Sequence, residues 1–227
     1  GVDVDPTSVE GANTLPYQID NLWVDWVQAD SAVPVLWWRS VGHTHTALTT
    51  EVFLDEVAER MGTDPVDLRR SLLGDNPRYL GVLNKAAEMA GGPMGTLEPA
   101  ADGRKRGRGI ALHKSFSSYV AEVADVTIAE DGEVLVDHVY CAVDCGRAIN
   151  PDVIKAQMEG GIGFGLGAVL NSEITLTDGK VDQANFDTYK TLRIDRMPAV
   201  TVAVIDSDEA PTGVGEPGTP PIGAAVL

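Results

Sequence analysis

The spacing of apolar residues predicts a run of helices in the first half of the chain. From about residue 47 to residue 61, apolar side chains recur at the spacing that is typical of an amphipathic helix. Asp64-Pro65 and Asn76-Pro77 each combine a capping side chain with a proline in the first turn, so each predicts a further helix start. The expected ends of the three helices are Gly62, Gly74 and Gly91-Gly92.

The residues before the first helix follow a different pattern. Up to about residue 45 the chain is expected to be irregular or strand-like, and all four tryptophans lie in this part. The alternation in residues 21–27 predicts a strand whose two faces are both partly covered.

From Arg108 onward the pattern becomes that of β-strands. Three runs rich in β-branched and aromatic residues are expected to be strands, and Asp131-Gly132 predicts a hairpin between the last two. A second Asp-Gly turn is expected at Asp178-Gly179. The predicted strands are 110–116, 119–129 and 134–143, with a further apolar β run at 200–205.

One more helix is expected to start at Asn150-Pro151 and to lead into a series of glycines between residues 160 and 167. Each glycine would destabilise an ordinary helix by about 1 kcal/mol. The series therefore indicates close approach of a ligand or of another helix. Helices followed by strands, with one helix between strands, predict an α+β fold of mixed sheets and packed helices.

Composition and charge narrow the classes of function. The net charge is −17, from 34 acidic and 17 basic residues, and such a surface repels phosphate backbones, so nucleic acid is excluded as an expected partner. The basic run at residues 104–108 is interpreted as a solvated loop. No apolar run is long enough to span a bilayer, and residues 1–5 show no secretory signal. These observations leave localisation open.

Cysteine and histidine do not form a recognisable ligand set. Cys141 and Cys145 are too few for a disulfide framework, and a zinc or iron–sulfur site needs more thiolate or imidazole ligands than their spacing offers. His43-x-His45 is interpreted as an ordinary loop feature. No metal ligand is therefore predicted in the chain.

Three segments could carry chemistry, and each has an ordinary structural alternative. Glu216 projects from a rigid Gly/Pro-rich loop at 213–221, which suits a positioned general base but also an exposed linker. The glycine-rich stretch at 157–163 could contact a heterocycle or oxyanion, or could pack tightly against another helix. Arg39 lies in a turn where it could bind an anion or pair with a surface acid.

The order and spacing of these segments, with others between them, resemble the molybdenum-binding large subunits of the xanthine oxidase family. The similarity is greatest to the branch of isoquinoline 1-oxidoreductase beta subunits and membrane-associated aldehyde dehydrogenases. Agreement is collinear over most of residues 16–222, and the last motif is specific to the family. The motifs are Trp38-Arg39-Ser40-Val41-Gly42, Glu51-x-Phe53-x-Asp55-Glu56, Gly62-x-Asp64-Pro65-x-x-x-Arg69-Arg70, Gly107-Arg108-Gly109-Ile110-Ala111, Val120-Ala121-Glu122-Val123, Val143-Asp144-Cys145-Gly146, Ile149-Asn150-Pro151, Gln157-x-x-Gly160-Gly161 and Gly213-x-Gly215-Glu216-Pro217-Gly218.

The resemblance implies that Glu216 is the catalytic base beside a molybdenum held by a pterin dithiolene. The implied reaction oxidises a C–H bond of an aldehyde or N-heteroaromatic compound with water as the oxygen source. By the same resemblance, the residues that contact the cofactor are Gln157 and the Gly160-Gly161 turn, Gly215, and the turn formed by Ser40, Val41 and Gly42. The chain is expected to be the C-terminal cofactor-binding portion, with a helical part at 1–105 and a β-rich part at 106–227 that carries the cofactor and catalytic loops.

The resemblance also implies partners. The molybdopterin, in its cytosine dinucleotide form, is expected to be shared with the upstream part of the same subunit, because the family's other glycine-rich cofactor loop is not visible here. Electrons are expected to pass to iron–sulfur clusters on a partner subunit, with a cytochrome subunit as a further partner. The alternative is a non-catalytic fragment or assembly module that is inactive alone.

Overall fold

The computed structural model describes residues 4–31 and 33–227. The prediction that residues 1–5 carry no secretory signal therefore falls partly outside the described residues. The helices are α1 (Gly42–Met61), α2 (Pro65–Leu73), α3 (Pro77–Ala90), α4 (Pro151–Leu170) and α5 (Pro220–Val226). The strands are β1 (Gly95–Leu97), β2 (Arg106–Ser115), β3 (Ser118–Ile128), β4 (Val134–Asp144), β5 (Leu176–Thr177), β6 (Lys180–Val181) and β7 (Ala199–Val204). Two short 3-10 helices occur at Pro6–Ser8 and Ile194–Arg196.

The predicted starts of α2, α3 and α4 and the predicted ends of α1, α2 and α3 are confirmed, whereas α1 begins at Gly42, about five residues before the predicted start. The Asp64 side chain accepts a hydrogen bond from the Val66 amide at the start of α2, and Asn150 does the same for Val153 at the start of α4. Gly62 adopts a left-handed conformation after α1, with a φ of 64° that suits glycine. Local capping chemistry was therefore sufficient to place these helices.

A five-stranded sheet forms the centre, in the order β1-β2-β3-β4-β7. Its first four strands are antiparallel neighbours, whereas β7 pairs in parallel with β4 after the chain has passed through α4. β2 and β3 are joined through Phe116 and Ser117, which both have positive φ, at 51° and 62°. The predicted α+β class with mixed sheets is confirmed.

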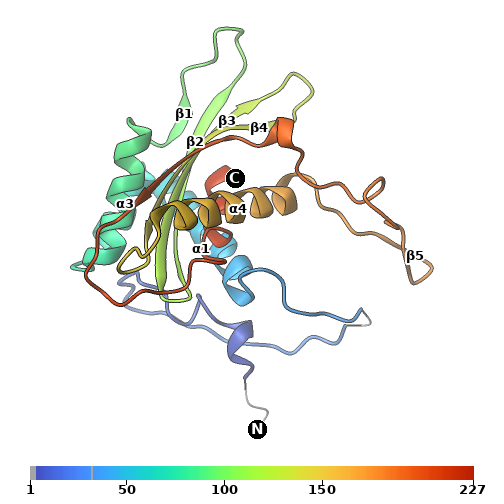
Figure 1. The fold of residues 1–227 in the computed structure, drawn as a ribbon, viewed down its shortest axis with the longest axis horizontal. Coiled ribbons are helices and arrows are strands. Elements are labelled where there is room, and N and C mark those ends of the chain that lie inside the picture. The colour runs from blue at the N-terminus through green and yellow to red at the C-terminus, as the bar shows by residue number, and fades with distance from the viewer. Residues whose placement is uncertain (1–3, 32) are drawn as a thin grey trace.

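Alternation along the strands supplies both faces of this sheet with apolar residues. On one face, strand residues such as Ile110 and Leu112 pack in the same apolar cluster as Val82 and Leu83 of α3. On the other face, Cys141 and its strand neighbours pack with residues of α4 and α5. Figure 1 shows α3 and α4 on opposite sides of the strands. The sheet is therefore covered by helices on both faces, which explains why its central strand, β3, is almost continuously buried.

Three local expectations are wrong. Residues 21–27 form no strand, and Trp23 and Val27 are exposed by 85% and 81%, because no described strand lies alongside to pair with them. Arg108 does not lie in a solvated loop but in β2, where its buried guanidinium pairs with Asp125. His43 and His45 lie in the first turn of α1.

The glycine series also differs from a simple turn. Gly160 and Gly161 lie inside α4, which continues to Leu170 without a break. Gly161 approaches the backbone of Gly218 and Thr219, as described below, whereas the surroundings of Gly160 are open. Over the described residues, none of the helices has the length and apolar character needed to cross a membrane.

Candidate active site

The three segments singled out from the sequence meet in space. Arg39 and Ser40 lie just before α1, Gly160 lies in α4, and Gly215 and Glu216 lie in the loop before α5. Hydrogen bonds between side chains and backbone join all three, over sequence separations of 121 and 176 residues. The fold therefore gathers these residues at one place on the molecule.

Ser40 holds Glu216 at two points. The Ser40 amide donates to Oε1 of Glu216 at 2.9 Å, and the Ser40 hydroxyl donates to the Glu216 carbonyl oxygen at 2.8 Å. Within the described part of the chain, Oε2 of Glu216 makes no hydrogen bond and the carboxylate forms no ion pair. One carboxylate oxygen is thus fixed, and the other is free to accept a proton.

The turn that presents the Ser40 amide is strained. Ser40 and Val41 both have positive φ, at 70° and 52°, and this region is unfavourable for a β-branched residue such as Val41. Such outliers cost on the order of 1–3 kcal/mol and persist where the surroundings enforce them. The next residue, Gly42, donates its amide to Glu10 at 2.8 Å, which helps to hold the turn.

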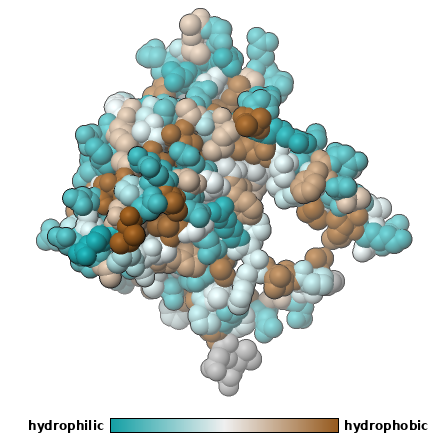
Figure 2. Space-filling view, in the orientation of Figure 1, coloured by the Kyte–Doolittle hydropathy of each residue, from teal (hydrophilic) through white to brown (hydrophobic). Residues whose placement is uncertain are grey.

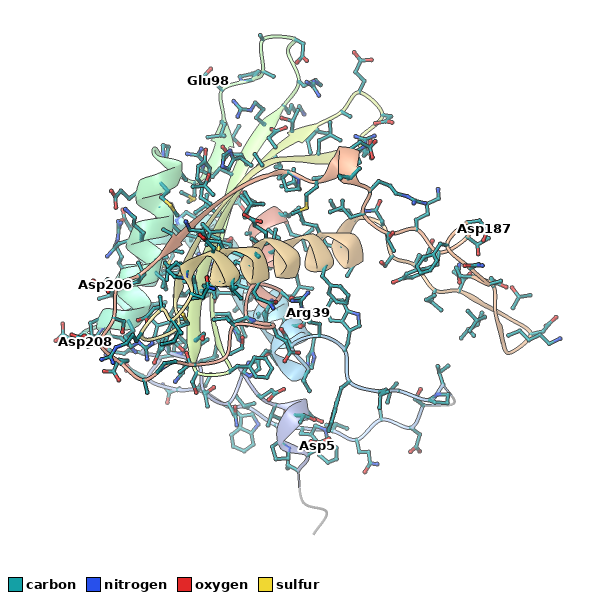
Figure 3. All side chains as sticks on the ribbon, viewed as in Figure 1. Asp5, Arg39, Glu98, Asp187, Asp206 and Asp208 are labelled. Atoms are coloured by element: carbon teal, nitrogen blue, oxygen red, sulfur yellow. The ribbon has the colours of Figure 1, made fainter. Side chains whose placement is uncertain are left out.

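Arg39 pairs with no acid among the described residues, so that alternative is wrong, whereas anion binding stays a prediction. Its guanidinium donates to the carbonyl oxygens of Gly160, at 3.3 Å, and Gly215, at 2.5 Å, and it lies over the Phe164 ring. In Figure 3 the labelled Arg39 lies beside α4. Its role is to tie α4 to the Glu216 loop.

Glycines let α4 and the Glu216 loop approach closely. A β-carbon added at Gly161 would lie 3.1–3.3 Å from backbone atoms of Gly218 and Thr219, and one added at Gly218 would lie 3.1 Å from the Met158 carbonyl oxygen. The Thr219 hydroxyl donates to the Gly161 carbonyl oxygen at 3.2 Å. Tight packing against the Glu216 loop therefore explains why a glycine stands at position 161. Packing was one of the two interpretations given for residues 157–163.

Gly160 and Gly215 differ from Gly161 because their surroundings are open. A β-carbon at either position would meet no atom of the described residues within 4 Å. Gln157, one turn before Gly160 on α4, is partly exposed, and its amide makes no hydrogen bond to other described residues. Bare backbone beside a free amide fits one edge of a polar, planar ligand such as a pterin.

A histidine pair beside this site was missed by the sequence analysis. Nδ1 of His43 and Nε2 of His113 are 2.9 Å apart, and Nε2 of His43 lies 3.6 Å from the Glu10 carboxylate. Burial lowers the pKa of His43, although the negative charges of Glu10 and Glu216 oppose this effect. Burial, with a smaller contribution from His43, lowers the pKa of His113 to about 3. Glu10, His43 and His113 come from three separate parts of the chain, so no local sequence pattern relates them.

An apolar hollow of about 440 Å³ adjoins the site. Trp38 and Val41 line it from the turn before α1, Leu48 lines it from α1, and Val169 and Thr219 line it from the far side. No Asp, Glu, Lys or Arg is among its lining residues. The hollow therefore suits an uncharged apolar group.

Comparison with known proteins agrees with this geometry. A family model described as a molybdopterin cofactor-binding domain matches residues 93–198. Isoquinoline 1-oxidoreductase subunit beta of Brevundimonas diminuta is 33% identical over 93% of this chain and 27% of its own length. The membrane-bound aldehyde dehydrogenase of Gluconacetobacter polyoxogenes, named for pyrroloquinoline quinone, is 32% identical over 84% of this chain and 26% of its own. The chain belongs to the molybdopterin-binding subunits of the xanthine oxidase family.

Solved structures of this family share the fold. Quinoline 2-oxidoreductase from Pseudomonas putida superposes with a TM-score of 0.72 at 13% identity, over 83% of this chain and 49% of that one. The aldehyde oxidoreductase from Desulfovibrio desulfuricans superposes with a TM-score of 0.63 at 14% identity, over 84% of this chain and 38% of that one. This chain spans about a quarter of the length of the curated relatives described above.

Proposed function

We propose that this chain supplies the catalytic base, Glu216, to a molybdenum hydroxylase that oxidises a C–H bond of an aldehyde or N-heteroaromatic substrate, with water as the oxygen source. The observation that carries the proposal is the carboxylate itself. It is held through Oε1 by the Ser40 amide, and its Oε2 is unpaired among the described residues. A positioned carboxylate with one free oxygen is what a general base requires.

The residues around Glu216 keep that oxygen in place. Arg39 ties the Gly215 carbonyl to α4, and the Gly161–Gly218 contact fixes the loop on its other side. Neither contact uses the carboxylate. Proton acceptance by Oε2 therefore requires no rearrangement of the loop, and such preorganisation is how an enzyme places a base.

A molybdenum cofactor bound here would supply the oxidising centre for two electrons from the substrate. It would also supply the oxygen atom of the product, which comes from water. Gln157, Gly160 and Gly215 would hold one edge of its pterin, and Gly161 would support them from behind by its contact with the Glu216 loop. The backbone of Ser40, Val41 and Gly42 would line the side nearest the metal. These residues make up only part of a cradle. The cytosine dinucleotide form, and a site shared with the upstream part of the subunit, belong to the same proposal.

The apolar hollow supports the substrate class. Its lining includes Val41, which follows Ser40, and Thr219, which lies three residues after Glu216, and it contains no Asp, Glu, Lys or Arg. An aromatic heterocycle or the carbon chain of an aldehyde would lose water there without leaving a charge unpaired. Electrons would leave through iron–sulfur clusters on a partner subunit, with a cytochrome subunit as a further acceptor.

The test is Glu216→Gln in the assembly of this chain with the upstream part of the subunit and the iron–sulfur partner. Glutamine keeps the size and can still accept the Ser40 hydrogen bond, but it cannot accept a proton. We expect molybdenum content, measured by mass spectrometry, to be unchanged, and turnover to fall by about a hundredfold to ten-thousandfold.

Glu209→Gln is the matched control, because Glu209 is exposed in the segment between β7 and the Glu216 loop. It should leave turnover unchanged. Undiminished turnover in Glu216→Gln would remove the catalytic assignment. Molybdenum absent from a demonstrably complete wild-type assembly, made in a host that synthesises the cofactor, would instead favour a non-catalytic module.

A further inference from the structure

The segment between Ile19 and Trp38, called here the tryptophan segment, makes almost no internal contacts through its backbone. The Gln18 amide bonds to the Leu72 carbonyl oxygen, and the Trp38 carbonyl oxygen accepts from the Val41 amide. Between these two anchors, no backbone–backbone hydrogen bond occurs among the described residues. The segment is therefore held at both ends. Between them, among the described residues, only Val33 has backbone hydrogen bonds, through its amide and carbonyl to the Ser31 hydroxyl, so the amides and carbonyls of residues 22–27 are unpaired.

The side chains of this segment are not those of a solvated linker. Trp23, Val27, Val35, Leu36 and Trp37 are each at least 74% exposed. So many exposed large apolar side chains within one segment indicate an interaction surface. In Figure 2 the part of the molecule that carries these residues stands away from the body, and an opening separates it from the arm that carries β5 and β6.

The conformation that the segment favours is a β-strand. Its residues 22–27 are all β-branched, aromatic or leucine except for Asp25, and this composition fits a strand with apolar neighbours. A lone strand is not stable in water, and the usual way to satisfy it is addition to an open strand edge. The strand that the sequence predicts here is therefore missing only a second strand with which to pair.

Charge indicates which partner is suitable. The segment has Asp20, Asp25 and Asp30 and contains no Lys or Arg, and the whole chain carries a net charge of −17. A second copy of this chain would place acidic residues against acidic residues, which disfavours pairing. The fitting partner presents an apolar edge with basic residues around it.

Position indicates what the partner contributes. Trp38 packs on Phe164 of α4 with ring centroids 4.8 Å apart, and Arg39 and Ser40 of the site follow directly. A polypeptide docked on the segment lies next to the open backbone of Gly160 and Gly215. In these relatives, the part of the chain outside the shared region is about three times as long as the shared region itself.

We propose that the tryptophan segment adds as a β-strand to an open, basic-rimmed strand edge of the polypeptide segment that makes up the rest of the cofactor subunit. The identity of that polypeptide rests on the proposed function. The pairing places its cofactor-binding surface against residues 38–42. Trp23 and Val27, on one face of the added strand, enter apolar pockets of the partner, while the backbone supplies the main-chain hydrogen bonds.

The experiment co-expresses this full chain with a tagged form of that polypeptide from the same source organism. Co-purification measures association, and amide hydrogen exchange measures the protection of residues 19–38. In the complex, these amides should exchange much more slowly than in the free chain. Trp23→Ser and Val24→Pro should each reduce association roughly thirtyfold or more, as loss of an interface hot spot or of a pairing amide does.

Phe53→Ser is the matched control, because Phe53 is 63% exposed on α1, outside the segment, and should leave association unchanged. The proposal is overturned if no complex forms, if a complex forms while residues 19–38 still exchange as in the free chain, or if the two variants bind like wild type. Protection of the segment in the chain alone, with self-association, would identify a second copy as the occupant and would also overturn it. A protected complex without turnover would contradict only the proposed function.

Discussion

Ser40 and Glu216 are joined by two hydrogen bonds across 176 residues of sequence, one from the Ser40 amide to the carboxylate and one from the Ser40 hydroxyl to the backbone. The first bond sets the direction of the carboxylate, and the second sets the position of the loop that carries it. The strained turn at Ser40 and Val41 exists where both bonds are made. The strain therefore contributes to placing the candidate base.

Substitutions of Ser40 separate the hydroxyl from the backbone strain. Ser40→Ala and Ser40→Gly both lose the bond to the Glu216 carbonyl, so turnover of the assembly should fall about fivefold in both, for a bond worth about 1 kcal/mol. Glycine adopts a φ of 70° without strain, so Ser40→Gly should be more stable to urea than Ser40→Ala by about 1 kcal/mol. Equal stabilities would show that this turn stores no strain.

Two adjacent glycines of α4 offer a matched pair. Gly161→Ala places a methyl group 3.1 Å from the Gly218 backbone and must push the Glu216 loop outward, whereas Gly160→Ala meets no described atom. A displacement of about 1 Å can cost on the order of a hundredfold in rate. We expect turnover of the assembly to fall on that scale in Gly161→Ala, with the free energy of unfolding of the chain lower by about 1–3 kcal/mol.

Gly160→Ala should leave the unfolding free energy of the chain equal to or slightly above the wild-type value, because alanine favours a helix. Its effect should appear in molybdenum content, since its methyl group projects where the pterin is proposed to lie. The same molybdenum content in Gly160→Ala and wild type would contradict that placement.

The fold was largely predictable from the sequence because its signals are local. Asp64, Asn76 and Asn150 each precede a proline at a helix start, and Asp178-Gly179 adopts the positive φ angles of a two-residue hairpin turn. Residues 21–27 were misjudged for a different reason. Their composition favours a strand, but a strand needs an edge to pair with, and pairing is a property of the surroundings.

The site was predictable in part. Glu216, Gly160 and Ser40 were identified through a family motif, yet nothing in the sequence showed that Arg39 would bond to carbonyl oxygens of both other segments. Long-range pairs such as His43 with His113 have no local signature at all. Side-chain partners depend on which elements pack together, and spacing along the chain does not encode that.

A buried ion pair between Glu51 and Arg69 explains the two family motifs that contain these residues. Their role is to stabilise the fold and not to take part in the reaction. Arg69 is fully buried, and it donates to the Glu51 carboxylate and the Glu51 carbonyl oxygen, both at 3.0 Å. Arg69→Met should lower the free energy of unfolding by about 3–5 kcal/mol, because it leaves Glu51 charged and buried without its partner.

Arg70→Met, one residue further on, is the control for Arg69→Met. Its ion pair with Asp67 is exposed, so urea unfolding should change by about 0.5 kcal/mol or less. The double variant Glu51→Met with Arg69→Met should recover part of the loss, since it removes the fully buried carboxylate and leaves only Asp55, which is partly exposed, without its arginine. A loss in the double variant as large as in Arg69→Met alone would show that the lost contacts, and not the stranded charge, are responsible.

Acid should destabilise the chain through His113. The pKa of His113 is lowered to about 3 by burial, below the value of about 6.5 in an unfolded chain. Between these two values the unfolded chain binds a proton that the folded chain does not. His113 should therefore reduce stability by about 1.4 kcal/mol per pH unit as the pH falls from about 6.5 toward 3. His113→Gln should remove this contribution, while His45→Gln, at an exposed position, should not.

Rising pH should destabilise the chain through Glu122, which lies in the centre of β3. Glu122 is fully buried, and neither carboxyl oxygen has a hydrogen-bond partner among the described residues, so burial raises its pKa well above the ordinary value. Above a pH of about 4.3 the unfolded chain releases this proton and the folded chain keeps it. Stability should therefore fall by about 1.4 kcal/mol per pH unit as the pH rises, until the folded carboxyl also ionises.

Glu122→Gln should abolish that fall, because the amide is neutral at every pH. Its free energy of unfolding should exceed that of wild type by a margin that grows between pH 5 and pH 8. Glu130→Gln, at an exposed position in the β3–β4 loop, should retain the wild-type slope. If Glu122→Gln also keeps the wild-type slope, Glu122 is ionised in the folded chain. A donor would then have to reach it, and the nearest candidate is the thiol of Cys141 on the neighbouring strand, whose pKa is raised by burial and by Glu122 itself.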